Sequence, residues 1–118
     1  MTMIKMVEPQ EWETFLYAFT NRNHGRRARF EIFGPNGGFK EEEQEGNFTK
    51  IALDNNKITV TRHYEKNGGQ QAMVDELNNV RGISVQYDTD NSVNVLEFAD
   101  GNGGKTTLHF ESKVDGVS

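Results

Sequence analysis

The chain has 118 residues, enough for one domain that buries a core without disulfides or a structural metal. It contains no cysteine, which excludes disulfides, thiolate catalysis and cysteine-ligated metal clusters. The formal net charge of −5 argues against a general nucleic-acid binder, because such proteins need a surplus of Lys and Arg to neutralise phosphates.

The N-terminal residues lack the apolar run of a signal peptide, and no other run is long enough to cross a membrane. We therefore expect a cytoplasmic protein with no membrane partner. Most glycines and asparagines stand between apolar runs, where they indicate turns.

Residues 8–21 form the one stretch in which apolar residues recur at helical spacing. Four of them fall at i, i+3, i+4 and i+7 and share one stripe: Trp12, Phe15, Leu16 and Phe19. Pro9 suits the first helical position, and Gly25 ends the pattern. The sequence therefore predicts a helix over 8–21 that packs on a sheet. Residues 3–7 are either a short extra strand or a lead-in to the helix.

Residues 27–33 alternate with the period of two that is typical of a strand with one wet face. The apolar members of this alternation are Ala28, Phe30 and Ile32. Residues 34–47 then have no periodicity and many glycines and glutamates, so we expect a long mobile loop. Its acidic run, Glu41–Glu45, is either a solvated segment or a contact for a basic partner.

The rest of the chain shows repeated hairpin patterns. Residues 48–53 and 57–64 flank Asp54–Asn56, whose side chains favour a tight turn. Residues 72–78 fit either a helical turn or an irregular strand, and their strand-like neighbours favour a strand. The same hairpin pattern predicts three further strands over 82–87, 92–98 and 105–111.

Together these signals predict a single α+β domain over residues 1–118. One N-terminal helix packs on a curved antiparallel sheet of about six strands in a meander, and closure into a partial barrel is open. The absence of a βαβ unit excludes doubly wound dinucleotide-binding folds.

Several residue groups along most of the chain carry a resemblance to a known family. They are the Trp-led helix (Trp12, Phe15, Phe19), the strand residues Arg27, Phe30, Glu31 and Ile32, the hairpin at Ile51–Asp54, and the last two strands over Leu96–Phe110. In this order the chain resembles a family of small bacterial proteins, domain of unknown function 5335. The resemblance implies the helix-and-sheet fold above, and it implies no activity or catalytic residue.

Four arginines cluster just after the predicted helix: Arg22, Arg26, Arg27 and Arg29. The planar guanidinium suits carboxylates and phosphates, so this cluster is a candidate site for an anion, an acidic partner or nucleic acid. The alternative is structural, because cations stabilise the carboxyl end of a helix and the wet face of a strand needs polar residues. Both interpretations stay open.

No other residue group predicts a catalytic, cofactor or metal site. The histidines His24, His63 and His109 lack metal-ligand spacing, although a site shared by the last two with Glu65 or Glu111 is geometrically open in a curved sheet. The Asp/Asn runs 88–91 and 100–102 resemble calcium loops, but they lack the bidentate Glu, so we interpret them as hairpin turns.

Two phenylalanines stand apart from the predicted core. Phe33 falls opposite the apolar face of its strand, and Phe39 lies in the polar loop, so each either caps the open side of the sheet or meets a partner.

Our leading hypothesis is a non-enzymatic interaction domain that self-associates, as a homodimer, or binds an unknown protein partner. It would use a sheet edge or the Phe33 and Phe39 region, with the arginines as a polar rim. One alternative is a small-ligand binder with a pocket in a half-closed sheet, its mouth formed by 34–47 and 66–71. A third is nucleic-acid or anion binding through residues 22–29.

Overall fold

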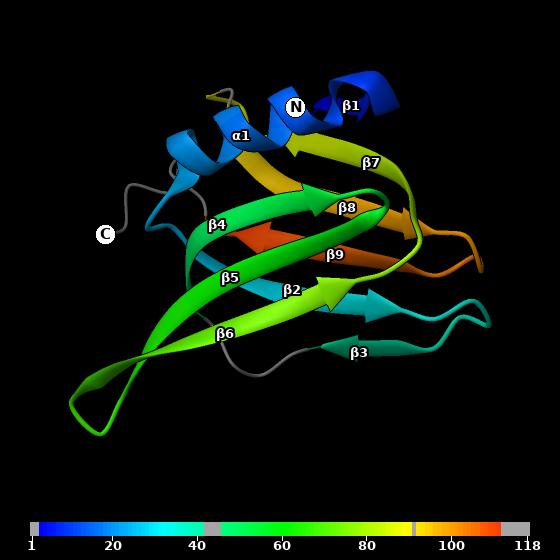
Figure 1. The fold of residues 1–118 in the computed structure, drawn as a ribbon. Coiled ribbons are helices and arrows are strands. Elements are labelled where there is room, and N and C mark those ends of the chain that lie inside the picture. Colours follow the sequence, from blue (N-terminus) through cyan, green and yellow to red (C-terminus); the bar gives the residue numbers. More distant parts are fainter. Residues whose placement is uncertain (1–2, 42–45, 91, 112–118) are drawn as a thin grey trace.

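The computed structural model describes residues 3–41, 46–90 and 92–111. It shows the predicted α+β class: one α-helix lies across one end of a large, curved antiparallel sheet (Figure 1). The helical elements are η1 (Pro9–Glu11), a single 3₁₀ turn, and α1 (Trp12–Asn23). The strands are β1 (Met3–Val7), β2 (Arg27–Phe33), β3 (Phe39–Glu41), β4 (Gly46–Asp54), β5 (Lys57–Lys66), β6 (Gly69–Leu77), β7 (Val80–Tyr87), β8 (Val93–Asp100) and β9 (Lys105–Phe110).

The predicted helix is present and extends two residues further, to Asn23. Its stripe faces the sheet, with Trp12, Leu16 and Phe19 buried. The indole Nε1 of Trp12 donates a buried hydrogen bond of 2.9 Å to the carbonyl of Val7. This bond ties the helix entry to the end of β1, so residues 3–7 are both a strand and the lead-in to the helix.

The sheet has nine strands, so the expectation of about six was wrong. The strand order is β1-β7-β8-β9-β2-β4-β5-β6, with β3 paired to β2, and all pairs are antiparallel. The sequence left β1 open between a strand and a lead-in to the helix, because it is short and its partner β7 is distant. β3 was not predicted as a strand, because it is short and follows a glycine-rich turn. The meander holds within β4-β5-β6 and β7-β8-β9, while β2 joins the two halves by pairing with β9.

Part of the expected mobile loop over 34–47 is regular structure, which corrects that prediction. β3 pairs with β2 through the register Phe33↔Phe39, and β4 already begins at Gly46. The glycines over 34–38 concealed this hairpin because they belong to its turn and show no alternation. Residues 42–45, most of the acidic run, lie outside the described part of the chain.

Residues 72–78 were interpreted as a strand, and this is confirmed by β6, which spans Gly69–Leu77. β6 joins β5 through a tight turn in which Asn67 and Gly68 have φ of 53° and 79°. Such left-handed angles at both central residues match the right-handed twist of a hairpin. The Asp54–Asn56 turn is likewise confirmed, with Asn55 at φ 57°.

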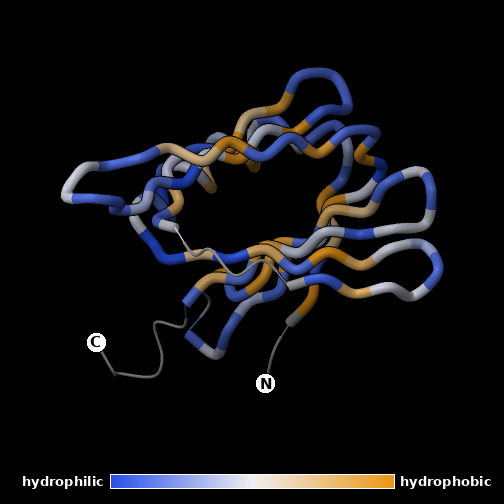
Figure 2. The backbone as a smooth tube through the Cα atoms, turned by 90° about the horizontal axis from the view of Figure 1, so that it is seen from below, coloured by the Kyte–Doolittle hydropathy of each residue, from blue (hydrophilic) through white to orange (hydrophobic). Residues whose placement is uncertain are grey.

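The sheet is strongly curved (Figures 1 and 2), but its strand order has two unpaired ends, so it does not close into a barrel. In the described residues, β6 pairs only with β5, and β1 pairs only with β7. Closure would require β6 to pair with β1, the strand at the other end of the order. These two strands are not paired in the described residues, so β1 and β6 remain the end strands of the sheet, and β3 is a short branch on β2.

The concave side of the sheet is filled by apolar side chains that pack under α1. An aromatic cluster of Phe19, Phe48 and Phe110 links the helix to β4 and β9, with ring centroids 5.4–5.6 Å apart in edge-to-face contacts. Phe48, Ile58, Val60, Ile83, Leu96 and Leu108 are fully buried. None of the helices in the described ranges is long and apolar enough to cross a membrane.

Candidate functional site

The structure separates the four clustered arginines into different roles. Arg22 is exposed on the last turn of α1, and Arg27 is exposed at the start of β2. Arg26, between them, is half-buried and turns inward, whereas Arg29 lies on the outer face of β2. The cluster is therefore not one continuous surface.

Arg26 is a structural tie between three parts of the chain. Its guanidinium donates to the side chain of Asn23 at 2.9 Å, to the carbonyl of Val93 at 2.8 Å and to the carbonyl of Glu111 at 2.6 Å. It also lies 5.1 Å from the centre of the Phe110 ring. Burial lowers the pKa of Arg26, although nearby carboxylates oppose this. The group remains charged at neutral pH and holds the helix end against β8 and β9.

Arg29 belongs to a network on the outer face, where β2 and β9 lie side by side. Its Nη1 is 2.8 Å from Glu31 Oε2, and the other Glu31 oxygen, Oε1, is 2.8 Å from His109 Nε2. The hydrogen bond from Arg29 is the main cause that lowers the pKa of Glu31, followed among the lowering causes by the charge of His109. An ionised Glu31 only accepts hydrogen bonds, so Nε2 of His109 carries a proton.

This network does not form a catalytic relay. Thr107 Oγ1 lies 3.0 Å from His109 Nε2, the same ring nitrogen that contacts Glu31. A relay needs the carboxylate on one ring nitrogen and the nucleophile on the other. Over residues 3–41, 46–90 and 92–111 there is also no group of three His, Asp or Glu side chains placed to hold a metal.

The other histidine on a strand takes a separate partner. His63 Nδ1 lies 2.6 Å from Thr49 Oγ1 on β4, and His109 bonds to Glu31 instead of Glu111. In the described part of the chain, the two rings therefore have different partners, and these contacts do not include Glu65 or Glu111.

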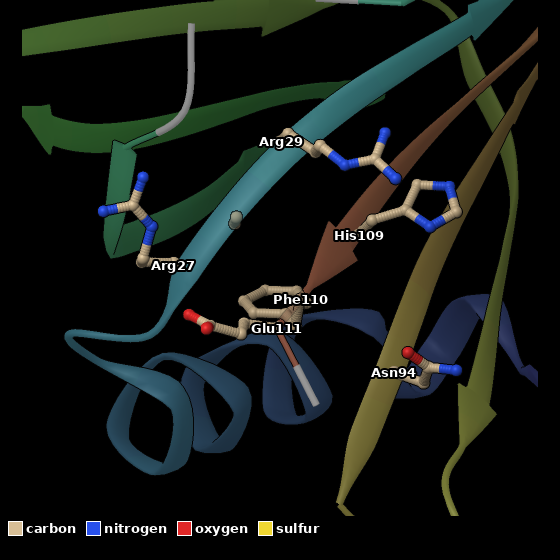
Figure 3. A pocket seen from close by; sticks show the side chains of 7 residues that line it. Arg27, Arg29, Asn94, His109, Phe110 and Glu111 are labelled. Atoms are coloured by element: carbon tan, nitrogen blue, oxygen red, sulfur yellow. The ribbon is translucent and has the colours of Figure 1, made fainter. Parts of the chain in front are cut away.

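A surface pocket of about 360 Å³ lies next to the Glu31 network, between β8, β9 and the start of β2 (Figure 3). Ala28 and Phe110 line it, and their side chains belong to the buried core. The polar side chains that line it are Arg27, Arg29, Asn94, His109 and Glu111. Arg27 and Arg29, two of the four clustered arginines, thus line the same pocket as His109, which lies about 80 residues further along the chain.

The Asp/Asn loops are hairpin turns whose carboxylates bond their own main chain. Asp100 Oδ1 accepts from the N–H groups of Asn102 at 2.8 Å and Gly104 at 3.0 Å, and Asp90 Oδ1 accepts from the N–H of Ser92 at 2.9 Å. These bonds point the carboxylates into the turns, which confirms the turn interpretation for the described residues of both loops.

Phe33 and Phe39 lie next to each other across the β2–β3 hairpin. Their ring centroids are 5.0 Å apart, and Lys105 Nζ lies 5.2 Å from the centre of the Phe33 ring. Phe39 is 55% exposed. This pair sits at the opposite end of β2 from Arg27, about 20 Å along the strand, so the arginines do not form a rim around it.

β6 is a nine-residue edge strand that the sequence did not identify as an edge. All nine residues pair with β5 without a register shift, and the hairpin reaches beyond the rest of the sheet (Figure 1). The stretch Gly69–Val74 contains no charged residue, and Val74 is 59% exposed on the outer face. The available signal was the uncharged run between Lys66 and Asp75, but the run alone does not show which strands lie at an edge.

Arg62 is a second feature that sequence reasoning missed. It follows Ile58 and Val60 on the inward face of β5 and is fully buried. Its guanidinium lies 4.6 Å from the centre of the Phe30 ring and 3.1 Å from Asp75 Oδ2 on β6. The signal was its inward position in the β5 alternation. The consequence is an ion pair between a buried guanidinium and a partly exposed carboxylate, which anchors the edge strand.

Comparison of the chain with protein-family models, with curated proteins and with solved structures found no match.

Proposed function

We propose that this protein is a non-enzymatic self-associating domain, in which the β6 edges of two copies pair into one continuous sheet. The observation that carries the proposal is the β6 edge, which pairs only with β5 in the part of the chain that the structure describes and has nine regular residues with no Lys, Arg, Pro or bulge. Proteins normally protect such an edge with charges, proline or a covering element, because its unpaired N–H and C=O groups recruit other strands. An edge of this length is therefore expected to be covered by a partner.

The charge pattern of β6 favours a second copy in antiparallel orientation. The only charged residues of β6 are Asp75 and Glu76, both at its C-terminal end. Parallel pairing in register would place each carboxylate beside its own copy, which is destabilising. Antiparallel pairing places the carboxylates at opposite ends of the shared segment.

Sheet geometry restricts the register of this antiparallel pair. A two-fold axis perpendicular to the sheet keeps outer-face residues opposite outer-face residues. This requires one residue to lie directly opposite its own copy, with the axis midway between the two. An axis at Ala72 pairs Gln70 with Val74 and places Asp75 opposite Gly69. This register leaves Glu76 beyond the shared segment, and we adopt it as the arrangement of the proposed dimer.

The other two functions lack a comparable observation. The inward residues of the sheet fill its concave side, which gives no support to a ligand pocket there. Arg26 is committed to three structural hydrogen bonds, which weakens a nucleic-acid surface along residues 22–29. Neither finding favours these functions over edge pairing.

Size-exclusion chromatography with light scattering at low and high salt tests the proposal. Because main-chain hydrogen bonds and apolar contact dominate an edge-to-edge interface, we expect a dimer whose population grows with protein concentration and survives high salt. A monomer at every concentration would contradict self-association. A dimer that dissociates at high salt would indicate a charged interface elsewhere on the molecule.

A further inference from the structure

A groove runs along one flank of α1, at the end of the sheet opposite the β6 edge. The flank is a helical stripe of Glu11, Phe15, Ala18 and Arg22, at i, i+4, i+7 and i+11, next to the stripe that packs in the core. Two pockets of about 310 and 350 Å³ lie along this flank, and Phe15 and Tyr87 line both of them. The pockets therefore adjoin at these two side chains and form one groove.

The sheet supplies the other wall of the groove, where α1 lies over β7 and β8 (Figure 1). Lys5 of β1 is paired with Val85 of β7, so the two side chains share the face of the sheet that α1 covers. Val93, at the start of β8, lines the same wall further along. Phe15 and Tyr87 pack against the core but are only partly buried, so the groove exposes part of each ring.

The two ends of the groove differ in charge. At the β1 end, Lys5 and Glu11 carry opposite charges in one pocket. At the other end, Arg22 is the only charged side chain among the described residues that line the pocket. The groove therefore has one end without net charge and one positive end.

The carboxylates of the adjoining β7–β8 turn interact with a different cation. Asp88 and Asp90 hold up the pKa of Arg26 against the effect of burial. Asp90 Oδ1 also accepts a hydrogen bond of 2.9 Å from the N–H of Ser92. Their negative charge is thus balanced in part by Arg26, and the positive charge of Arg22 remains at this end of the groove.

The length and shape of the groove indicate a narrow, flexible ligand. Glu11 and Arg22 are 11 residues apart, which corresponds to about 16 Å along a helix. One acyl chain has about this length, because two of them span the roughly 30 Å hydrocarbon core of a bilayer. A flexible chain can occupy both pockets and pass between Phe15 and Tyr87, whereas a rigid ring system fits only one of them.

We propose that this groove binds a single-chain amphiphilic carboxylate, a free fatty acid in solution. Arg22 pairs with the carboxylate, and the hydrocarbon chain extends along α1 towards Lys5. The chain covers the exposed parts of the Phe15 and Tyr87 rings, which supplies the apolar share of the affinity. The site uses α1, β1, β7 and β8 and does not depend on β6.

An NMR titration of the ¹⁵N-labelled chain with dodecanoate, kept below its micelle concentration, tests this proposal. We expect saturable shifts in α1, β1, β7 and the start of β8. Octanoate should bind more weakly by about tenfold or more, because it buries four fewer methylene groups. Dodecyltrimethylammonium has the same chain with a positive headgroup and should also bind more weakly by about tenfold or more. Equal or tighter binding of this cation would overturn the proposal.

Three variants locate the headgroup and the chain. Arg22→Gln should weaken dodecanoate binding by about tenfold or more, because it removes a charge-assisted donor. Arg81→Gln is the matched control: it removes an exposed arginine of β7 that does not line the groove, so binding should not change. Ala18→Leu fills part of the groove with a good helix former and should weaken binding of all three probes.

The ¹⁵N spectrum of each variant shows whether its fold is intact. The proposal is overturned if Arg81→Gln weakens binding as much as Arg22→Gln, if a folded Ala18→Leu variant binds dodecanoate as the parent chain does, or if dodecanoate shifts no groove resonance.

Discussion

The two edges of the sheet differ in the properties that decide whether an edge recruits another strand. β1 has five residues, and Lys5 stands at its centre. β6 has nine residues, and its first six carry no charge. A central lysine on a short edge opposes pairing, because the incoming strand must bury or displace a charge. Ile4 and Met6 of β1 are 71% and 67% exposed, so if apolar exposure decided pairing, β1 would be the interface. We expect charge position and length to decide it instead, and therefore pairing at β6.

The two edges are also held by different interactions. β6 is anchored through the ion pair of Asp75 with the buried Arg62, whereas β1 is anchored by Val7, which packs in the core and accepts a hydrogen bond from Trp12. Variants can therefore disturb one edge while leaving the other in place.

The largest effect is expected from Arg62→Ala. The substitution removes a fully buried side chain that stacks on Phe30 and ties β5 to β6 through Asp75, so we expect a loss of about 2–5 kcal/mol in unfolding free energy, mainly from the cavity that it leaves. Urea denaturation measures this loss. Lys57→Ala is the control, because the pair of Lys57 with Glu76 is exposed and 3.7 Å apart, and it should cost less than about 1 kcal/mol. Equal losses in the two variants would contradict the anchoring role of Arg62.

Trp12→Phe should act on the other edge. It removes the indole donor and leaves the Val7 carbonyl without that buried partner, so we expect a loss of about 1–3 kcal/mol. Hydrogen exchange should show faster exchange in β1 than in the parent chain, with β6 unchanged. Equal acceleration in both edges would show that the two anchors are not independent.

Val74→Lys should convert β6 into a protected edge. Val74 is exposed, so the stability of the monomer should change by no more than about 0.5 kcal/mol. The dimer dissociation constant should rise by about tenfold or more, because the lysine would be placed within the shared segment. Ile4→Lys on β1 is the matched control and should leave it unchanged. Sedimentation equilibrium compares the three chains, and a similar rise in both variants would contradict an interface at β6.

A change in the middle of the sheet sharpens the comparison, because it should affect neither edge. Glu31 has a pKa below its ordinary value of 4.5, so its ionised form stabilises the fold above that pH. Glu31→Gln should therefore cost about 0.2–1 kcal/mol at neutral pH. The difference between the two chains should vanish as the pH falls through the lowered pKa. Denaturation curves over this pH range measure it, and a difference that grows towards acid would have the wrong sign.

The sequence was most informative where the structure depends on local spacing. The helical stripe of Trp12, Leu16 and Phe19 predicted α1, and the alternation over 27–33 predicted β2 to the residue. Tight turns were predicted from Asn and Asp, which tolerate left-handed angles as Asn55 does.

The sequence was least informative where the structure depends on distant partners. Nothing local to β2 indicates that it pairs with β9, and so nothing could place Arg29 opposite His109. The edge position of β6 follows from the strand order, in which β1 and β6 are the two end strands, and this order is a property of the whole sheet. The arginine cluster was noticed as a group, but the inward turn of Arg26 follows from acceptors on β8 and after β9.

The most direct test of the β6 interface is disulfide formation in the cysteine-free chain. With the two-fold axis at Ala72, an Ala72→Cys variant places two Cα atoms about 4.5–5.5 Å apart across the interface, within the range of a disulfide. In Gln70→Cys the two thiols lie on the same face of the shared sheet, one on each copy of β6. They are about 14 Å apart, because Gln70 of one copy lies opposite Val74 of the other, four residues from that copy's own position 70. The proposed dimer predicts rapid cross-linking of Ala72→Cys under mild oxidation, and little of Gln70→Cys or of Ile4→Cys on β1. Equal cross-linking of all three, or none in Ala72→Cys, would contradict it.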